Sequence, residues 1–420
     1  MLGEAGLDIR QLVDIARAII EGRLAGPAAG EYSRLLRRAN VEYRDPASIA
    51  LADRLRAFYR LMRRGVLSYT INRVTLSLSY IGLDGVDFDD AQRLLAFMHS
   101  LGIAKAAIKS RFMTCPKCGS QRLIVHLVCS RCGSRSLHRT RIIHHRLCGY
   151  VGREDEFEEA ATGQGLVCPR CGTPLREEGV DYEVVGEVYV CEDCGALVRR
   201  PEVLLECASC GHEFPYHEGV YKGVMTAEPT ALGEALWLNA VVEVALFEDA
   251  LRRRGVQNIQ VPGELSARGL AAARVLGLQA SVPKILLEAA SGRAGRRAAA
   301  VFLDTLRRYD SLDSFISSTL NWFVLDAIRR YGRFMFIVIV DDEAGELVEA
   351  IRSHGVIASM SAQSKALGRE IVVGTPSDIS PSILERHGIG VILVAPVSGA
   401  DVVSEVEVIA DLAVKLLSAA

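Results

Sequence analysis

The stretch "HHRLCGY" (144–150) decides how the cysteines of this chain are organised. Cys148 has no cysteine three residues before it; His145 stands at that position, and Gly149 follows. Elsewhere the pattern Cys, two residues, Cys, Gly occurs five times, as "CPKCG" (115–119), "CSRCG" (129–133), "CPRCG" (168–172), "CEDCG" (191–195) and "CASCG" (207–211). The stretch therefore indicates a sixth copy, in which histidine replaces the first cysteine. His144 has the wrong spacing, although a shift by one residue stays open.

This spacing is typical of zinc knuckles. Two residues between ligands let the backbone turn tightly enough for both ligand atoms to face one ion, and glycine accepts the positive φ that follows. Eleven cysteines and one histidine supply twelve ligands, enough for three four-coordinate sites. Such saturated sites favour structural zinc over an iron–sulfur cluster or a catalytic ion. We therefore predict three structural Zn²⁺ ions, held by Cys115, Cys118, Cys129, Cys132, His145, Cys148, Cys168, Cys171, Cys191, Cys194, Cys207 and Cys210.

The order of the knuckles suggests how they pair. Joining neighbours in sequence gives three zinc ribbons: Cys115, Cys118, Cys129 and Cys132; then His145, Cys148, Cys168 and Cys171; then Cys191, Cys194, Cys207 and Cys210. The connecting stretches have 10, 19 and 12 residues, which suits hairpins. An interleaved pairing is the alternative.

Composition limits the compartment and the class of protein. Half of the 420 residues are hydrophobic, so the chain can build a sizeable core. The longest apolar run, Phe334–Val340, is far too short to cross a membrane. The beginning, "MLGEAGLDIR", has neither the basic nor the apolar region of a signal peptide. We expect a cytoplasmic protein without membrane contact, whose thiols stay reduced.

Charge is distributed unevenly around the knuckles. Residues 101–150 contain ten Lys and Arg and no acidic residue, whereas residues 151–226 contain sixteen Asp and Glu against six Lys and Arg. The basic segment predicts a surface for nucleic acid, with DNA preferred to RNA, that would contact phosphates. Its candidate residues are Lys117, Arg122, Arg131, Arg135, Arg139, Arg141 and Arg146. The alternative is that these side chains pair with the acidic segment or with a regulatory protein.

Residues 111–226 resemble the thaumarchaeal output domain, a multi-zinc-ribbon module of archaeal regulatory proteins. The resemblance covers about a quarter of the chain and rests on motif order: the first two knuckles, then "HHRLCGYVGREDEF" (144–157), "LVCPRCGTPLREEGVDYEVVGEVYVCEDCG" (166–195) and "CASCGHEF" (207–214). It implies the output end of a signal-transduction or regulatory system that contacts nucleic acid or protein.

The first hundred residues show helical patterns. Apolar residues recur at helical spacing in "DIRQLVDIARAIIEGRLAG" (8–26), with Asp8 as a candidate N-cap, and in "DPASIALADRLRAFYRLMRRG" (45–65), which starts at Asp45. A third helix is expected in "DFDDAQRLLAFMHSLGI" (87–103). The alternating stretch 66–83 predicts a short strand or a helix. This order suits a winged-helix-like domain or a helical packing domain.

The last two hundred residues predict an α/β domain with a largely parallel sheet. Strands are expected at "RRAAAVFLD" (296–304) and "RFMFIVIVDD" (333–342); "EAGELVEAIRSHGVIAS" (343–359) and "ILERHGIGVILVAP" (383–396) each predict a helix, a glycine and a strand. Asp341–Asp342 after a strand leaves a receiver-like domain as an alternative. The loop "VSGAD" (397–401) precedes a helix and could bind phosphate there.

Proteins related to the output-domain family combine its ribbons with a restriction-endonuclease-like domain, and "LFEDALRRRGVQNIQVPGELSARG" (246–269) resembles the opening of that fold. The stretch after Gly263 has no histidine or aspartate where the nuclease motif requires them, and Glu243, Glu264 and Asp304 are isolated acids. The resemblance implies a degraded, non-catalytic version, with a Mg²⁺-dependent nuclease as an alternative.

The sequence thus predicts a multidomain α+β protein. It has a helical, winged-helix-like region (1–105), a tri-zinc ribbon module (111–226) and an α/β domain (232–420). We expect a zinc-binding regulatory output protein that binds nucleic acid and is not an enzyme. A protein–protein interaction scaffold is the alternative.

Overall fold

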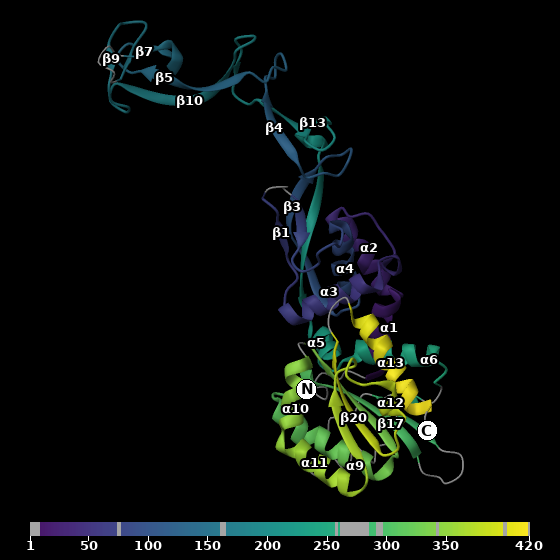
Figure 1. Ribbon diagram of the computed structural model, residues 1–420. Coiled ribbons are helices and arrows are strands. Elements are labelled where there is room, and N and C mark those ends of the chain that lie inside the picture. Colours follow the sequence, from purple (N-terminus) through teal and green to yellow (C-terminus); the bar gives the residue numbers. More distant parts are fainter. Residues whose placement is uncertain are drawn as a thin grey trace. The chain divides into compact units, whose positions relative to one another are not determined.

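We describe the protein from a computed structural model (Figure 1). The structure describes residues 9–73, 77–159, 165–256, 259–260, 285–290, 297–341, 344–397 and 401–418. It contains two compact units. One, which we call the body, comprises residues 1–70, 78–110 and 223–420; the other, which we call the zinc module, comprises residues 71–77 and 111–222. The N-terminal helical region and the C-terminal α/β region thus belong to one unit.

The N-terminal part of the body is mainly helical, as the sequence predicts. Its helices are α1 (Ile9–Glu21), α2 (Pro27–Ala39), α3 (Leu51–Arg64) and α4 (Phe88–Ser100). The Asp87 carboxylate caps α4 by accepting hydrogen bonds from the amides of Asp89 and Asp90. Asp45 caps a short 3₁₀ turn (Pro46–Ser48) ahead of α3, and Asp8 lies outside the described residues. Within residues 66–83, the described residues include β1 (Tyr69–Ile71) and β2 (Leu78–Tyr80), which pair in a two-stranded sheet.

A six-stranded sheet forms the centre of the C-terminal part, in the order β15-β16-β17-β18-β20-β19. Four neighbouring strands are parallel: β17 (Arg297–Thr305), β18 (Arg333–Val340), β20 (Ile389–Pro396) and β19 (Glu370–Gly374). β15 (Ile259–Gln260) and β16 (Ile285–Ala290) extend this sheet in antiparallel fashion. The expected largely parallel sheet is confirmed.

Helices cover both faces of the sheet. All eight residues of β18 are buried, and its side chains alternate between two cores. Met335, Ile337 and Ile339 share a core with α6 (Val241–Arg253), α12 (Pro381–Leu384) and α13 (Val402–Ser418). Phe336 and Val338 share the other core with α8 (Leu312–Phe315), the π-helical turn Ile316–Leu320, α9 (Asn321–Arg330), α10 (Ala344–Ser353) and α11 (Gly355–Ala366). None of the described helices has the length and apolar character needed to cross a bilayer.

The strand expected after Gly355 is wrong. Residues 355–366 form helix α11, and the His354 ring accepts a hydrogen bond from the Val356 amide at its start. Its buried residues, Ile357, Met360 and Ser364, recur at helical spacing rather than in alternation. The short apolar run "GVIAS" is too brief to distinguish the two periods, so packing decides between them.

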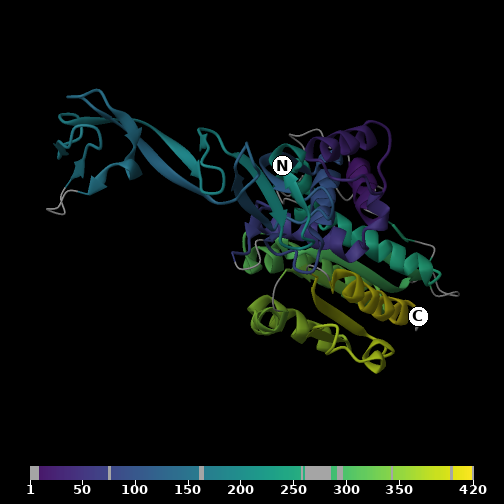
Figure 2. The ribbon, with the colours of Figure 1, turned by 90° about the horizontal axis from the view of Figure 1, so that it is seen from above.

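The N-terminal helices and one face of the sheet share a single hydrophobic core. That core includes Leu12 of α1, Phe58 of α3, Phe247 of α6 and Leu393 of β20. Arg17 of α1 also forms an ion pair with Glu248 of α6, at 3.5 Å. Figure 2 shows the N-terminal helices beside α6. The N-terminal helices and the C-terminal sheet therefore stabilise each other through this shared core.

The zinc module consists of small antiparallel sheets. β4 (Leu123–Val128), β12 (Glu202–Cys207) and β13 (Glu213–Pro215) form one sheet, in the order β13-β12-β4. β5 (Leu137–His145) and β10 (Tyr182–Cys191) are the centre of a second, edged by β6 (Val151–Arg153) and β11 (Leu197–Val198). The third contains β7 (Glu158–Glu159), β8 (Leu166–Val167) and β9 (Pro174–Leu175). The two-stranded sheet of β3 (Ala104–Thr114) and β14 (Val220–Pro229) has residues in both units.

Candidate metal centres

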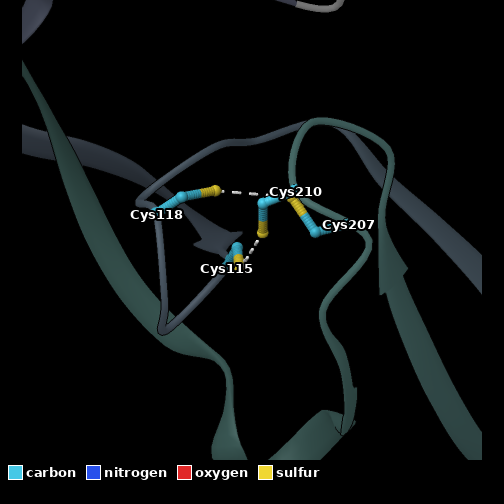
Figure 3. Close-up of side chains that lie close together, drawn as sticks. All are labelled: Cys115, Cys118, Cys207 and Cys210. Atoms are coloured by element: carbon cyan, nitrogen blue, oxygen red, sulfur yellow. Dashed lines mark hydrogen bonds between the residues drawn. The ribbon is translucent and has the colours of Figure 1, made fainter.

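The twelve predicted ligands meet in three groups of four. Within each group all ligand atoms lie within 4.8 Å of one another. Figure 3 shows the first group, where the sulfurs of Cys115 and Cys210 are 3.8 Å apart and those of Cys118 and Cys207 are 3.5 Å apart. Four sulfurs at about 2.3 Å from one ion, at tetrahedral corners, lie about 3.8 Å from each other. The geometry therefore fits a tetrahedral Zn²⁺ ion and excludes disulfides, whose sulfurs are about 2.05 Å apart.

The other two groups have the same dimensions. In the second, sulfur distances are 3.8 Å between Cys129 and Cys194 and 3.6 Å between Cys132 and Cys191. In the third, Nδ1 of His145 lies 3.2 Å from the sulfur of Cys148 and 3.5 Å from that of Cys171. All three sets are complete with four protein ligands, so these are structural zinc sites.

The sequential pairing of knuckles is wrong for two of the three sites. The first knuckle pairs with the sixth, giving Cys115, Cys118, Cys207 and Cys210, and the second pairs with the fifth, giving Cys129, Cys132, Cys191 and Cys194. Only the central site, His145 with Cys148, Cys168 and Cys171, joins neighbours in sequence. The pairing is nested, so it is not the interleaved alternative either.

Strand register explains the nesting. β4 begins just after the first knuckle and pairs antiparallel with β12, so that Leu123 lies opposite Cys207 of the sixth knuckle. β5 follows the second knuckle and pairs with β10, which places Leu137 opposite Cys191 of the fifth. In an antiparallel pair the start of one strand meets the end of its partner. Each of the two nested sites therefore lies where a ladder begins.

The knuckle glycines adopt the expected backbone conformation. Gly119 has a φ of 71°, and its amide donates to the Cys115 carbonyl at 2.9 Å. The other five knuckle glycines, Gly133, Gly149, Gly172, Gly195 and Gly211, also have positive φ. A residue with a side chain rarely adopts this conformation, which explains why glycine follows the second ligand of each knuckle.

Hydrogen bonds stabilise thiolates within the sites. The Thr173 hydroxyl lies 3.3 Å from the Cys171 sulfur, and with the Thr173 amide it lowers the pKa of Cys171 to about 6. The Cys194 amide similarly lowers the pKa of Cys191 to about 7. Since zinc binds the thiolate, these bonds favour the form that binds metal. Nothing in the sequence pattern identified Thr173 as such a donor.

The adjacent histidines have different surroundings. His145 is 1% exposed and points its Nδ1 atom at two cysteines of the central site. His144 points away, with its Nδ1 atom 2.8 Å from a carboxylate oxygen of Glu183. Neighbouring side chains of strand β5 point to opposite faces, so only one of the two histidines can face the site. His145, and not His144, is therefore the ligand.

We predict that His145→Ala lowers bound zinc from three ions to two per chain, because it removes one of four ligands. His144→Ala is the matched control and should keep all three. Metal analysis of the purified proteins checks this result. Loss of zinc from the His144 variant would show that the register is wrong.

The basic residues predicted to bind nucleic acid fall into two groups. Four form ion pairs within the module: Arg135 with Glu213, Arg139 with Glu187, Arg141 with Glu154, and Arg146 with Glu183. The partners of Arg139 and Arg141 lie on β10 and in the 3₁₀ turn Glu154–Glu156. The exposed side chains of Lys117, Arg122 and Arg131 have no ion pair or hydrogen bond with the described part of the chain.

These ion pairs hold several carboxylates in the charged form. Arg141 lowers the pKa of Glu154, and Arg135 lowers that of Glu213. His144 and Arg146 together lower the pKa of Glu183. All of these side chains are partly exposed to solvent, which screens the charges, so each pair contributes little stability by itself. Their consequence is that positive charge on β5 is matched by negative charge nearby.

The isolated acids of the body are already bonded. Glu243 of α6 pairs with Arg307, and Asp304 at the end of β17 accepts hydrogen bonds from the Thr305 amide at 2.8 Å and the Tyr309 hydroxyl at 3.0 Å. Glu264 and residues 398–400 of the "VSGAD" loop lie outside the described residues.

Arg307 is the centre of a buried charge cluster that the sequence did not reveal. Its Nε donates to Asp341 at 2.8 Å, Nη1 donates to the Trp237 carbonyl at 3.1 Å, and Nη1 also contacts Glu243. The rings of Trp237 and Tyr59 lie 5.3 and 5.6 Å from the guanidinium. Burial alone would lower the pKa of Arg307, but Glu243 and Asp341 outweigh it and raise the pKa. Asp341 is thus bonded to Arg307, contrary to the open aspartate of a receiver site.

Comparison with known proteins finds a similarity to a family model that covers residues 75–227. No curated protein and no solved structure matches the chain. The segment that matches the family model begins at residue 75, whereas the sequence predicted a start at residue 111. It also includes β2, α4 and all of β3. The expected resemblance is confirmed: residues 75–227 match the family model of thaumarchaeal output domain 1.

Proposed function

We propose that the zinc module acts as the protein-binding output part of a regulatory protein. The observation that supports this most is the internal pairing of Arg135, Arg139, Arg141 and Arg146, which leaves these side chains little free charge for phosphates. Phosphate contacts supply most of the affinity of proteins for nucleic acid.

The charge of the whole module supports the same conclusion. Residues 111–222 contain fourteen Lys and Arg against sixteen Asp and Glu. Three Zn²⁺ ions bound to eleven thiolates and one neutral imidazole add five further negative charges. A surface of this net charge repels a polyanion over distances of about a Debye length.

Nucleic-acid binding is the second candidate, because one observation favours it. Lys117 and Arg131 lie between the ligands of the first two knuckles, Arg122 lies between these knuckles, and all three side chains are exposed. They have no partner among the described residues. A local contact of these three residues with DNA or RNA would have a small salt dependence, equivalent to about three phosphates.

We also propose that the protein is not an enzyme. The zinc sites are filled by four protein ligands each, which leaves no position for substrate. Glu243 and Asp304 are held by Arg307 and Tyr309, so neither offers a free carboxylate for Mg²⁺. Mg²⁺-dependent cleavage of DNA that disappears in Asp304→Ala or Glu264→Ala would contradict this proposal.

The experiment is a binding series with random double-stranded DNA and with RNA at increasing salt. We expect little binding at physiological salt and no effect of changing Arg135, Arg139 and Arg141 to alanine together. The matched variant changes Lys117, Arg122 and Arg131. A steep fall of affinity with salt that the first triple variant abolishes would overturn the proposal, and loss in the second variant alone would favour the second candidate.

A further inference from the structure

The outer strand of one zinc-module sheet is open along its length. β4 (Leu123–Val128) lies at the edge of the sheet β13-β12-β4, with β13 on the opposite side (Figure 1). Residues 123–128 make no backbone hydrogen bond outside their ladder with β12 to any described residue. β4 has six residues. The edge strands β6 and β13 have three residues each, and the edge strand β11 has two, so β4 is the longest of these four.

The register tells which backbone groups face outward. The Ala208 amide donates to the Arg122 carbonyl at 2.9 Å, so these two residues form a hydrogen-bonded pair. Such pairs alternate along an antiparallel ladder. Ile124 and His126 therefore direct their amides and carbonyls to β12, whereas Leu123, Val125 and Leu127 direct theirs to the open edge.

Exposed side chains flank this edge. Val125 is 63% exposed, Ile124 46% and Leu127 36%, and β4 contains no Lys, Arg, Asp or Glu. Its one histidine, His126, contacts Glu206 of β12 at 2.9 Å. Free edges are normally protected by charged residues, proline or a bulge, because they pair readily with another strand. β4 has none of these features, which is typical of a strand that accepts a partner.

The surrounding charge selects the partner. Lys117, Arg122 and Arg131 are exposed and lie on the chain before and after β4, in a module whose net charge is otherwise negative. Pairing of two β4 strands antiparallel would bring Arg122 of one copy to the Arg131 end of the other, where like charges repel. An extended segment with acidic residues at its ends avoids this repulsion, and its carboxylates can pair with the three basic side chains.

We propose that β4 is a strand-addition site for an extended apolar peptide segment with acidic residues at its ends, supplied by another protein. This inference rests on the proposed protein-binding function and names its partner by chemistry. Backbone bonds to Leu123, Val125 and Leu127 would give affinity, and the basic residues would give selectivity.

The test uses the full-length, zinc-loaded protein and two synthetic peptides. Both have a core of alternating valine and threonine; one has two glutamates at each end and the other two lysines. We expect the acidic peptide to bind at least tenfold more tightly. Val125→Pro should weaken it at least tenfold, since it removes an outward amide without breaking a bond to β12. Val125→Thr keeps that amide and is the matched control.

A second variant protects the test from misfolding. Arg122→Glu with Arg131→Glu should reverse the preference toward the lysine peptide, and each variant must retain three zinc ions. Equal binding of both peptides, no binding, or unchanged binding in Val125→Pro would overturn the inference. If the protein forms a dimer that Val125→Pro dissociates, the strand that pairs with β4 comes from a second copy of this chain. If DNA binds at this site and neither peptide does, the proposed protein-binding function itself is wrong.

Discussion

Removal of zinc is expected to unfold the zinc module while the body stays folded. The buried groups of the module are small and centred on ligands: Cys115, Leu205, Cys207 and Phe214 at the first site, and Cys129, Cys191 and Val198 at the second. Clusters of this size cannot offset the entropy of ordering more than a hundred residues. Each structural zinc contributes on the order of 10 kcal/mol, so the metal supplies most of the stability.

The two tryptophans make this result measurable. Trp237 and Trp322 both belong to the body. After treatment with a strong chelator, amides of β4, β5, β10 and β12 should lose protection from hydrogen exchange, whereas tryptophan emission should stay native. Readdition of three equivalents of Zn²⁺ should restore protection. Protection that survives complete removal of zinc would contradict a module held together by metal.

Arg307→Ala is expected to have the second largest effect, a loss of about 3–5 kcal/mol in the unfolding free energy of the body. Arg307 has 3% of its side chain exposed, and its removal leaves the buried Glu243 carboxylate without its partner. The same change removes the contacts to Trp237 and Asp341. The cost is large because an unpaired buried charge is desolvated without compensation.

Urea unfolding followed by tryptophan fluorescence measures this loss, since Trp237 contacts Arg307 directly. The matched control is Arg330→Ala, which removes an exposed pair with Asp326 at 2.7 Å. That change should cost no more than about 0.5 kcal/mol. Equal midpoints for the two variants would show that the buried cluster contributes no stability.

The sequence revealed the zinc ligands because ligand spacing is a local property. The pattern of two residues between ligands and a following glycine fixed all twelve positions, including His145 in place of a cysteine. The pairing of knuckles is not local. It depends on which strands form ladders, and the relevant signals, such as Arg141 opposite Glu187, become visible only once β5 is aligned with β10.

In the body, too, local features could be predicted from the sequence and contacts between distant residues could not. Its parallel strands were evident from apolar runs such as 333–340, because a strand covered on both faces contains few polar residues. Helix α11 was mistaken in part for a strand, since five residues do not define a period. The Arg307 cluster joins residues from α3, α5 (Ala231–Leu238) and α6 with Asp341, which directly follows β18, and no pattern along the chain relates them.

Nested pairing is the central claim, and zinc counting in two double variants tests it most directly. Cys118→Ser with Cys210→Ser removes two ligands of one site, so that protein should retain two zinc ions. Cys118→Ser with Cys132→Ser damages two sites and should retain one. Sequential pairing gives the opposite result, with one zinc ion in the first variant and two in the second, and that outcome would contradict the fold of the module.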